Sequence, residues 1–171
     1  MKTFANIPSE KNFENWEVFN HDTYLKSDEK KKREIRQATC LARYNIEKDK
    51  NYSWMENYFS SKLSTNDLND KILLDFGSFT GGRIVAWAEN YKLKKSYGID
   101  INPIFKVASD EFAKEKNINA DFTTGVGENL PYEDNFFDFI VSTDTFEHVQ
   151  SLEKSMNECY RVLKPGGKLL A

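Results

Sequence analysis

The chain has 171 residues, of which 39% are hydrophobic and 30% are charged, and this composition is ordinary for one soluble globular domain. The net charge of −3 gives no overall attraction to nucleic acid or to an anionic membrane, and no apolar run approaches the length of a membrane span. Cys40 and Cys159 come without the apolar core of a signal peptide at the N-terminus, so we expect free thiols in a reducing cytoplasm. We therefore predict a cytoplasmic protein that binds neither nucleic acid nor a membrane.

Residues 1–70 are expected to form a helical N-terminal extension rather than an independent domain. Ser27 can cap the start of a helix that begins with acidic residues and runs to about Ile46. The basic run Lys30–Arg33 has acidic neighbours, so we interpret it as a solvent-exposed helix face. A second amphipathic helix is expected over residues 52–63. The apolar stripe of the first helix consists of Ile35, Ala38, Ala42 and Ile46.

The stretch Lys71–Gly82, which reads KILLDFGSFTGG, follows this extension. Its apolar residues end in Asp75, glycines follow, and a good helix former begins at Arg83. This pattern predicts a buried parallel strand that enters a helix through a tight turn. Glycines allow unusual backbone angles and the close approach of a ligand, and the helix N-terminus offers free N–H groups. We interpret the stretch as a nucleotide-cofactor turn.

The spacing of the glycines helps to distinguish between cofactors. Gly77, Phe79 and Gly82 occupy the three glycine positions of the dinucleotide fingerprint, and a side chain at the middle position disfavours contact with a pyrophosphate. S-adenosylmethionine has no phosphate, and its ammonium and sulfonium groups suit the carboxylate of Asp75. The turn therefore favours S-adenosylmethionine over a nicotinamide dinucleotide.

This turn resembles the first motif of the class I S-adenosylmethionine-dependent methyltransferases, which runs acid-x-Gly-x-Gly-x-Gly. Asp75, Gly77 and Gly81 match this motif, and Phe79 replaces its middle glycine. The resemblance implies S-adenosylmethionine as the cofactor. It assigns cofactor binding in this stretch to Asp75, Gly77, Ser78, Phe79 and Gly81.

A second strand is expected at Ser96–Asp100, and it ends in an acid 18 residues after Gly82. An acid at this distance is placed to accept hydrogen bonds from the ribose hydroxyls. The alternative is that Asp100 caps the helix that begins at Pro103. We assign Asp100 and its neighbour Ile101 to the cofactor site.

A short third strand is expected at Ala120–Thr124, followed by Gly-Val-Gly-Glu-Asn-Leu-Pro-Tyr. This segment resembles the family sequence Gly-Asp-Ala-Glu-x-Leu-Pro-Phe, which wraps the adenine. Val126 stands where the family usually has an acid, so the resemblance implies that backbone amides near Gly127 and apolar contacts hold the adenine. Gly127 and Glu128 are the cofactor residues that we assign here.

The fourth strand, expected at Phe137–Ser142, leads into a segment that should border the transferred methyl group. Thr143 is assigned to the cofactor, and Asp144 and His148 are the candidate catalytic residues. His148 is either a general base for a hydroxyl acceptor or a structural hydrogen-bonding group at a helix start. Asp144, Glu147 and His148 could instead hold a divalent cation, although we predict no metal site.

A helix is expected at Ser151–Leu163, followed by a sharp turn at Gly166–Gly167 and a fifth strand. The run Arg-Val-Leu-Lys-Pro-Gly-Gly resembles a recognisable segment of the same superfamily. The chain stops three or four residues into the fifth strand, which suggests a fragment whose C-terminal sheet edge a second copy could cover as a homo-oligomer. The residues expected to face inward from the helix are Leu152, Met156, Cys159, Tyr160 and Leu163.

These motifs predict an α/β fold: a Rossmann-like, doubly wound and mostly parallel sheet. Residues 1–70 would be a helical extension on the lid and acceptor side, and residues 71–171 an S-adenosylmethionine-binding core that is incomplete at its C-terminus. The predicted function is methyl transfer to a small-molecule or glycan acceptor, with oxygen ranked before nitrogen or carbon. The alternatives are a cofactor-binding fragment without turnover, a nicotinamide-dependent oxidoreductase and, third, a nucleic-acid methyltransferase.

Overall fold

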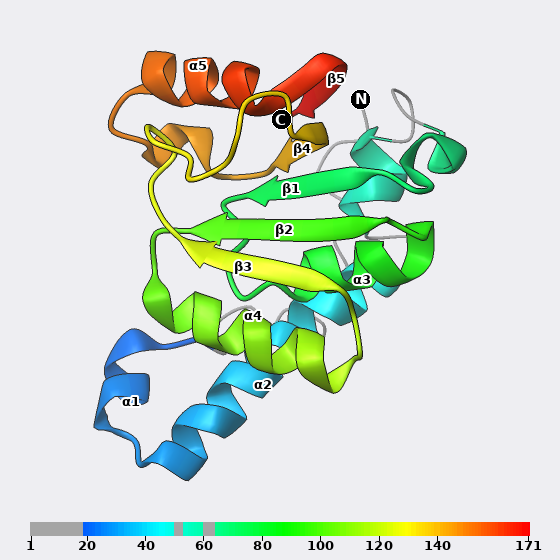
Figure 1. Cartoon of the computed structure of the whole chain (residues 1–171). Helices are drawn as coiled ribbons and strands as arrows, with labels where there is room; N and C mark the ends of the chain where they lie inside the picture. The colour runs from blue at the N-terminus through cyan, green and yellow to red at the C-terminus, as the bar shows by residue number, and fades with distance from the viewer. Residues whose placement is uncertain (1–18, 50–52, 60–63) are drawn as a thin grey trace.

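A five-stranded, fully parallel sheet forms the centre of the molecule (Figure 1). The computed structural model describes residues 19–49, 53–59 and 64–171. The strand order is β3-β2-β1-β4-β5. From β1, the chain adds β2 and β3 on one side of the sheet and then β4 and β5 on the other side, so the direction of strand addition reverses between β1 and β4. The strands are β1 (Ile72–Phe76), β2 (Lys95–Asp100), β3 (Ala120–Thr124), β4 (Phe137–Ser142) and β5 (Leu163–Leu170). The predicted Rossmann-like α/β fold is confirmed.

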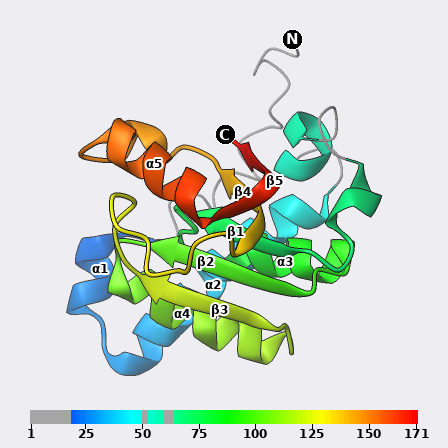
Figure 2. The same ribbon diagram turned by 45° about the horizontal axis from the view of Figure 1, so that its top comes forward.

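Helices cover both faces of this sheet. The views in Figures 1 and 2 place α2, α3 and α4 on one face and α5 on the other. None of the helices in the described ranges is long and apolar enough to cross a membrane. The α-helices are α1 (His21–Lys26), α2 (Glu29–Lys48), α3 (Gly82–Tyr91), α4 (Pro103–Glu115) and α5 (Leu152–Val162). Shorter helical turns are η4 (Met55–Phe59), η5 (Thr65–Leu68) and η6 (Phe146–His148).

The hydrophobic core consists of two clusters, one on each side of the sheet. Leu73 packs into the cluster that contains Trp87 of α3, whereas its neighbour Leu74 packs into the cluster that contains Cys159 of α5. Successive strand residues point to opposite faces, and both faces are covered by helices. For this reason β1 begins with three consecutive apolar residues, Ile72 to Leu74, instead of an alternating pattern.

The predicted buried stripe of α2 is wrong in part. Ala38 is exposed, and the buried face instead carries polar side chains that have partners on other helices. Arg36, for example, donates to both carboxylate oxygens of Glu111 on α4 at 2.9 and 2.8 Å. The helix is also capped by Asp28 rather than by Ser27, since the Asp28 side chain accepts the Lys31 N–H at 2.7 Å.

Two further expectations about helices and turns need correction. In α5 the predicted inward residues Leu152, Met156 and Tyr160 are exposed, because the helix turns Ser155, Cys159 and Val162 toward the sheet. The segment Gly166–Gly167 lies within β5 as a register irregularity and not as a sharp turn before it. Of the helix expected over residues 52–63, the structure shows η4 at Met55–Phe59, and residues 52 and 60–63 lie outside the described ranges.

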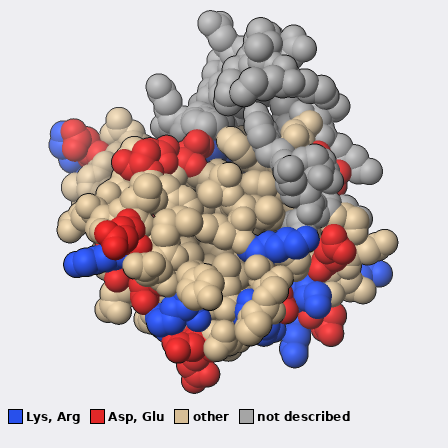
Figure 3. All heavy atoms as spheres, turned by 90° about the horizontal axis from the view of Figure 1, so that it is seen from above, with Lys and Arg blue, Asp and Glu red and all other residues tan. Residues whose placement is uncertain are grey.

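The surface seen from above mixes both signs of charge. Lys, Arg, Asp and Glu side chains are interspersed around a broad uncharged centre on this face (Figure 3). The basic run of α2 shows the same mixing, because Lys32 pairs with Glu29 at 2.8 Å and Lys31 with Glu34 at 3.2 Å. These pairs support our interpretation of that run as a solvated helix face.

Candidate functional site

A cavity of about 360 Å³ lies at the carboxyl ends of β1, β2 and β4, beside the point where the strand order reverses. Open parallel sheets bind their ligands in the crevice at this point. Most of the residues assigned to the site from the sequence line this cavity. They are Gly77, Ser78, Phe79, Asp100, Ile101, Gly127, Glu128, Thr143, Asp144 and His148.

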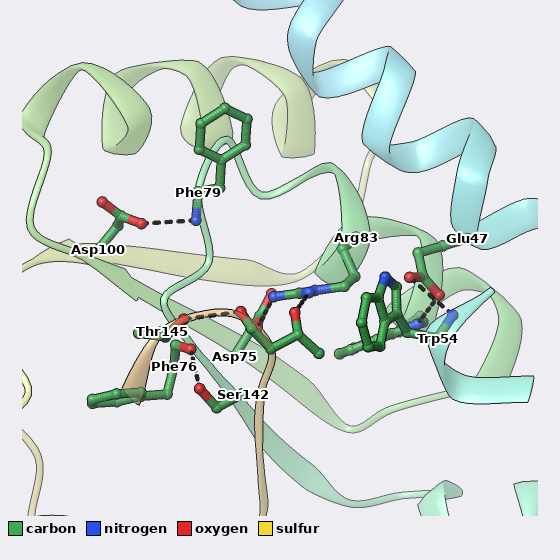
Figure 4. A network of polar contacts seen from close by, with 11 residues as sticks. Glu47, Trp54, Asp75, Phe76, Phe79, Arg83, Asp100, Ser142 and Thr145 are labelled. Carbon is green, nitrogen blue, oxygen red and sulfur yellow. Dashed lines mark hydrogen bonds and ion pairs between the residues drawn. The ribbon is translucent and has the colours of Figure 1, made fainter. Parts of the chain in front are cut away.

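Asp75 and Gly81, which were also assigned to the cofactor, lie behind the wall of the cavity. The Asp75 carboxylate is fully buried and accepts two hydrogen bonds from Arg83, from Nε at 3.2 Å and from Nη2 at 2.7 Å (Figure 4). Burial raises the pKa of Asp75, and the Arg83 guanidinium opposes that shift. The wall therefore presents Arg83, which also contacts the Thr143 hydroxyl, in place of the carboxylate.

Gly81 has a structural position at the start of α3. It caps the helix with a left-handed φ of +70°, and an added Cβ would lie 2.6 Å from the Ser109 hydroxyl and 2.7 Å from the Phe122 ring. Only a glycine satisfies both the backbone angle and the close packing. The packing of α3 on α4 and β3 therefore accounts for a glycine at this position.

Phe79, which stands at the middle glycine position of the motif, has a left-handed backbone conformation. Its φ is +50°, and its ring packs at 4.4 Å from the Phe105 ring and 5.3 Å from the Arg43 guanidinium. Figure 4 shows the ring pointing away from Asp100 and from the Asp75–Arg83 pair. The aromatic ring therefore packs against α4 and α2 while the backbone of Phe79 stays in the left-handed region.

Asp100 lies at the tip of β2 with its carboxylate held in place by backbone groups. One oxygen accepts the Phe79 N–H at 2.9 Å and the other accepts the Asn102 N–H at 3.0 Å. Burial raises the pKa of Asp100, and these hydrogen bonds oppose the shift. The alternative role as a helix cap belongs to Asn102, whose side chain accepts the Ile104 N–H at 3.0 Å.

The wall beyond Asp100 is apolar. Ile101 and Val126 are 69% and 40% exposed, although both line the cavity. Gly127 approaches β1 so closely that an added Cβ would lie 2.3 Å from the Phe76 ring. Two exposed aliphatic side chains and a closely packed glycine therefore form this part of the cavity wall.

The opposite wall comes from the loop after β4. Asp144 has a φ of +53°, uncommon for a residue with a side chain, and such strain is frequent at functional sites. Asp144 and His148 are exposed at the cavity, whereas Glu147 does not line it. Across the described ranges, no group of three or more His, Cys, Asp or Glu side chains could hold a metal ion.

The sequence analysis placed the N-terminal extension on the lid and acceptor side, but it assigned none of the residues of this extension to the site. Arg43, Ile46 and Glu47 of α2 line the cavity together with Trp54. Glu47 is buried, and it accepts hydrogen bonds from the Trp87 indole at 2.7 Å, the Ser53 hydroxyl at 2.9 Å and the Trp54 N–H at 3.2 Å.

The charges of this wall influence one another. Burial raises the pKa of Glu47, and burial together with the nearby Arg83 lowers the pKa of Arg43. A Glu and an Arg in a strongly polar helix look like surface residues. No local signal in the sequence distinguished Arg43 and Glu47 from solvent-exposed residues of the same helix.

Comparison with known proteins shows the family to which this chain belongs. The sequence model of a family described as "Methyltransferase domain" matches residues 74–171. The chain is 33% identical over 102 residues to norajmaline N-methyltransferase of Rauvolfia serpentina, a match that covers 58% of this chain and 35% of that protein. It is 35% identical over 102 residues to the ubiquinone/menaquinone biosynthesis C-methyltransferase UbiE of Hydrogenovibrio crunogenus, covering 58% and 40%.

A third relative is malonyl-[acyl-carrier protein] O-methyltransferase 1 of Coxiella burnetii, 34% identical over 103 residues, covering 60% of this chain and 33% of the relative. The chain therefore spans between 33% and 40% of the length of these three relatives.

Solved structures share the fold. YcgJ of Bacillus subtilis superposes with a TM-score of 0.57 at 28% identity, covering 61% of this chain and 45% of that structure. A putative S-adenosyl-L-methionine-dependent methyltransferase of Methanococcus maripaludis superposes with a TM-score of 0.62 at 21% identity, covering 78% and 61%. A match at this second level of identity supports the fold alone.

Proposed function

Because this chain belongs to the methyltransferase domain family, the class I enzymes whose cofactor is S-adenosylmethionine, we propose that the protein methylates a small-molecule or glycan acceptor. The observation that carries this proposal is the carboxylate of Asp100, which lies at the tip of β2 between the glycine turn and an apolar wall. A ribose with an attached adenine needs this combination of an acceptor for two hydroxyls and a flat apolar surface.

The other residues of the cavity fit the rest of the cofactor. Its volume of about 360 Å³ lies within the range of small-molecule pockets. Ile101 and Val126 would cover the two faces or edges of the adenine. The methionine end carries a carboxylate and an ammonium, which suit the guanidinium groups of Arg43 and Arg83 and the carboxylate of Asp144.

Methyl transfer depends more on the positioning of the two reactants than on covalent catalysis by the protein. When bound, S-adenosylmethionine supplies an electrophilic methyl group on a sulfonium. The chain's own residues would align the acceptor and exclude water, and alignment alone can provide a large share of the rate acceleration. The exposed imidazole of His148 would take the proton from a hydroxyl acceptor.

The relatives include enzymes named for transfer to nitrogen, carbon and oxygen, so the acceptor is part of the proposal. We rank oxygen first because His148 and Asp144 line the same wall. The two buried free thiols, Cys40 and Cys159, support a cytoplasmic location.

Calorimetric titration of the intact protein with S-adenosylhomocysteine and with NAD⁺ tests the cofactor. We expect saturable binding of S-adenosylhomocysteine and none of NAD⁺, and the reverse result would overturn the proposal. Transfer of a radiolabelled methyl group to fractions of a cell extract then tests turnover. Binding without transfer would favour a non-catalytic cofactor-binding protein.

The role of His148 is tested in the same assay. His148→Ala should lower kcat and leave the affinity for S-adenosylhomocysteine unchanged, because the imidazole acts on the acceptor. His21→Ala, which changes the other histidine of the chain at an exposed position of α1, is the matched control. An unchanged kcat in His148→Ala would remove the general base from the mechanism.

A further inference from the structure

The loop between β3 and β4, which supplies the apolar wall of the cavity, is held along its second half by α5. Glu158 of α5 accepts the Leu130 N–H at 2.7 Å. Arg161, one turn further along the helix, donates to the Leu130 carbonyl at 2.9 Å and to the Tyr132 carbonyl at 2.8 Å. Leu130 follows the cavity-lining residue Glu128 by two positions, so these bonds act close to the cavity wall.

The guanidinium of Arg161 uses its full set of donors in this contact. Besides the two carbonyls, it donates to both carboxylate oxygens of Glu158 at 2.7 Å and to Asp134 at 2.8 Å. Five N–H donors thus meet five acceptors, which is the complete capacity of an arginine side chain. A lysine offers a single ammonium and cannot reproduce this planar arrangement.

A second link joins the same loop to the other end of α5. The carboxylate of Glu128 accepts the N–H of Ser151 at 2.9 Å, and Ser151 is the N-cap of α5. The residues just before Ser151, from His148 to Gln150, line the opposite wall of the cavity. One carboxylate therefore connects the apolar wall to the wall that carries His148.

We propose that Arg161 and Glu128 are positioning residues, through which α5 sets the placement of the adenine wall relative to the wall that borders the methyl group. This inference rests on the proposed function, because it assumes that the cavity binds an adenosine cofactor. The placement matters because a misalignment of about 1 Å between reacting groups can cost roughly 100-fold in rate.

Arg161 is tested by binding of adenosine and of S-adenosylhomocysteine to the intact protein, well below its melting temperature. Arg161→Ala and Arg161→Lys should each raise the dissociation constants of both ligands by a similar factor, about tenfold. Arg33→Ala, at an exposed position of α2, is the matched control. A loss of stability with unchanged dissociation constants would show that Arg161 only supports the fold, and would overturn the proposal.

Glu128 is tested by comparing two substitutions. Glu128→Ala removes the acceptor for the Ser151 N–H and should lower both kcat and the affinity for the cofactor. Glu128→Gln keeps an oxygen acceptor, so it should retain most of the wild-type kcat and affinity. Values within twofold of wild type for Glu128→Ala would refute the link. If the wild-type protein binds neither adenosine nor S-adenosylhomocysteine, the proposed function itself fails, and this inference with it.

Discussion

Gly77 and Gly166 adopt almost the same backbone angle in very different surroundings. Their φ values are +79° and +81°, both in the left-handed region that favours glycine. An added Cβ at Gly77 would lie 2.0 Å from the Thr145 hydroxyl, whereas at Gly166 it would meet no atom within 4 Å. The pair therefore separates the effect of the backbone angle from the effect of packing at the site.

We expect Gly77→Ala to destabilise the protein more than Gly166→Ala. Both substitutions incur the left-handed backbone penalty of about 1–2 kcal/mol. Gly77→Ala adds the overlap with Thr145, for which overpacking costs of about 1–3 kcal/mol are typical. Urea denaturation measures the difference, and the added substitution Thr145→Ala should recover part of it. Equal losses at the two glycines would contradict the packing argument.

Asp100 is the residue whose prediction depends most directly on the ligand. Asp100→Ala should weaken the binding of S-adenosylhomocysteine by about 1–3 kcal/mol, which raises the dissociation constant roughly 5- to 150-fold, because it removes the acceptor for the ribose hydroxyls. Asp110→Ala, at an aspartate of the exposed face of α4, is the control. Calorimetry measures both dissociation constants, and an unchanged value for Asp100→Ala would exclude Asp100 from the cofactor site.

At the scale of elements, the contact of α5 with the loop before β4 makes stability depend on pH. The hydrogen bond from Arg161 lowers the pKa of Glu158 below its ordinary value of 4.5. The folded protein therefore favours the ionised carboxylate, and the resulting stability is fully present above the ordinary pKa. It is lost as the pH falls through the lower pKa of the folded state.

We expect Glu158→Gln to remove this dependence. The difference in the free energy of unfolding between wild type and Glu158→Gln should be largest above the ordinary pKa of 4.5 and shrink as the pH falls below it. Denaturation at several pH values measures it, with Glu153→Gln at an exposed position of the same helix as the control. A difference that is constant over this range would contradict the predicted role of the ion pair.

At the scale of the whole molecule, the cavity joins parts of the chain that are distant in sequence. Its wall combines Arg43 and Glu47 of α2 with loops that follow four strands of the sheet. A ligand that fills it binds only the folded arrangement of all these parts, so it must stabilise the molecule as a whole.

Addition of S-adenosylhomocysteine at a hundredfold excess over its dissociation constant should raise the free energy of unfolding by about 2.7 kcal/mol. For a chain of this size the melting temperature should rise by roughly 5–10 °C. Thermal denaturation measures the shift, and NAD⁺ at the same concentration is the control. A shift with NAD⁺ alone would contradict the assignment of the cofactor.

Local patterns were sufficient to predict the parallel sheet, apart from the start of β5, and most of the residues that line the cavity. The bounds of β3 and β4 agree with the structure residue for residue. A short, mainly apolar run between turn residues marks β4, whereas β3 contains the β-branched and aromatic residues that favour a strand. The loops that line the cavity follow directly from that sheet, since the carboxyl ends of parallel strands meet at one edge. Gly77 and Asp100 could therefore be placed from local patterns, and Gly127 from the resemblance of its segment to the family sequence.

The tertiary structure decided which polar side chains are buried and what they contact. Asp75 pairs with Arg83 and does not reach the cavity, while Glu47 is buried because Trp87 and Ser53 donate to it. The periodicity of a sequence predicts which face of a helix or strand is apolar. A polar group is buried only where a partner from another element forms a hydrogen bond or ion pair with it. Those partners are neighbours in space and not in sequence, so no local pattern contained them.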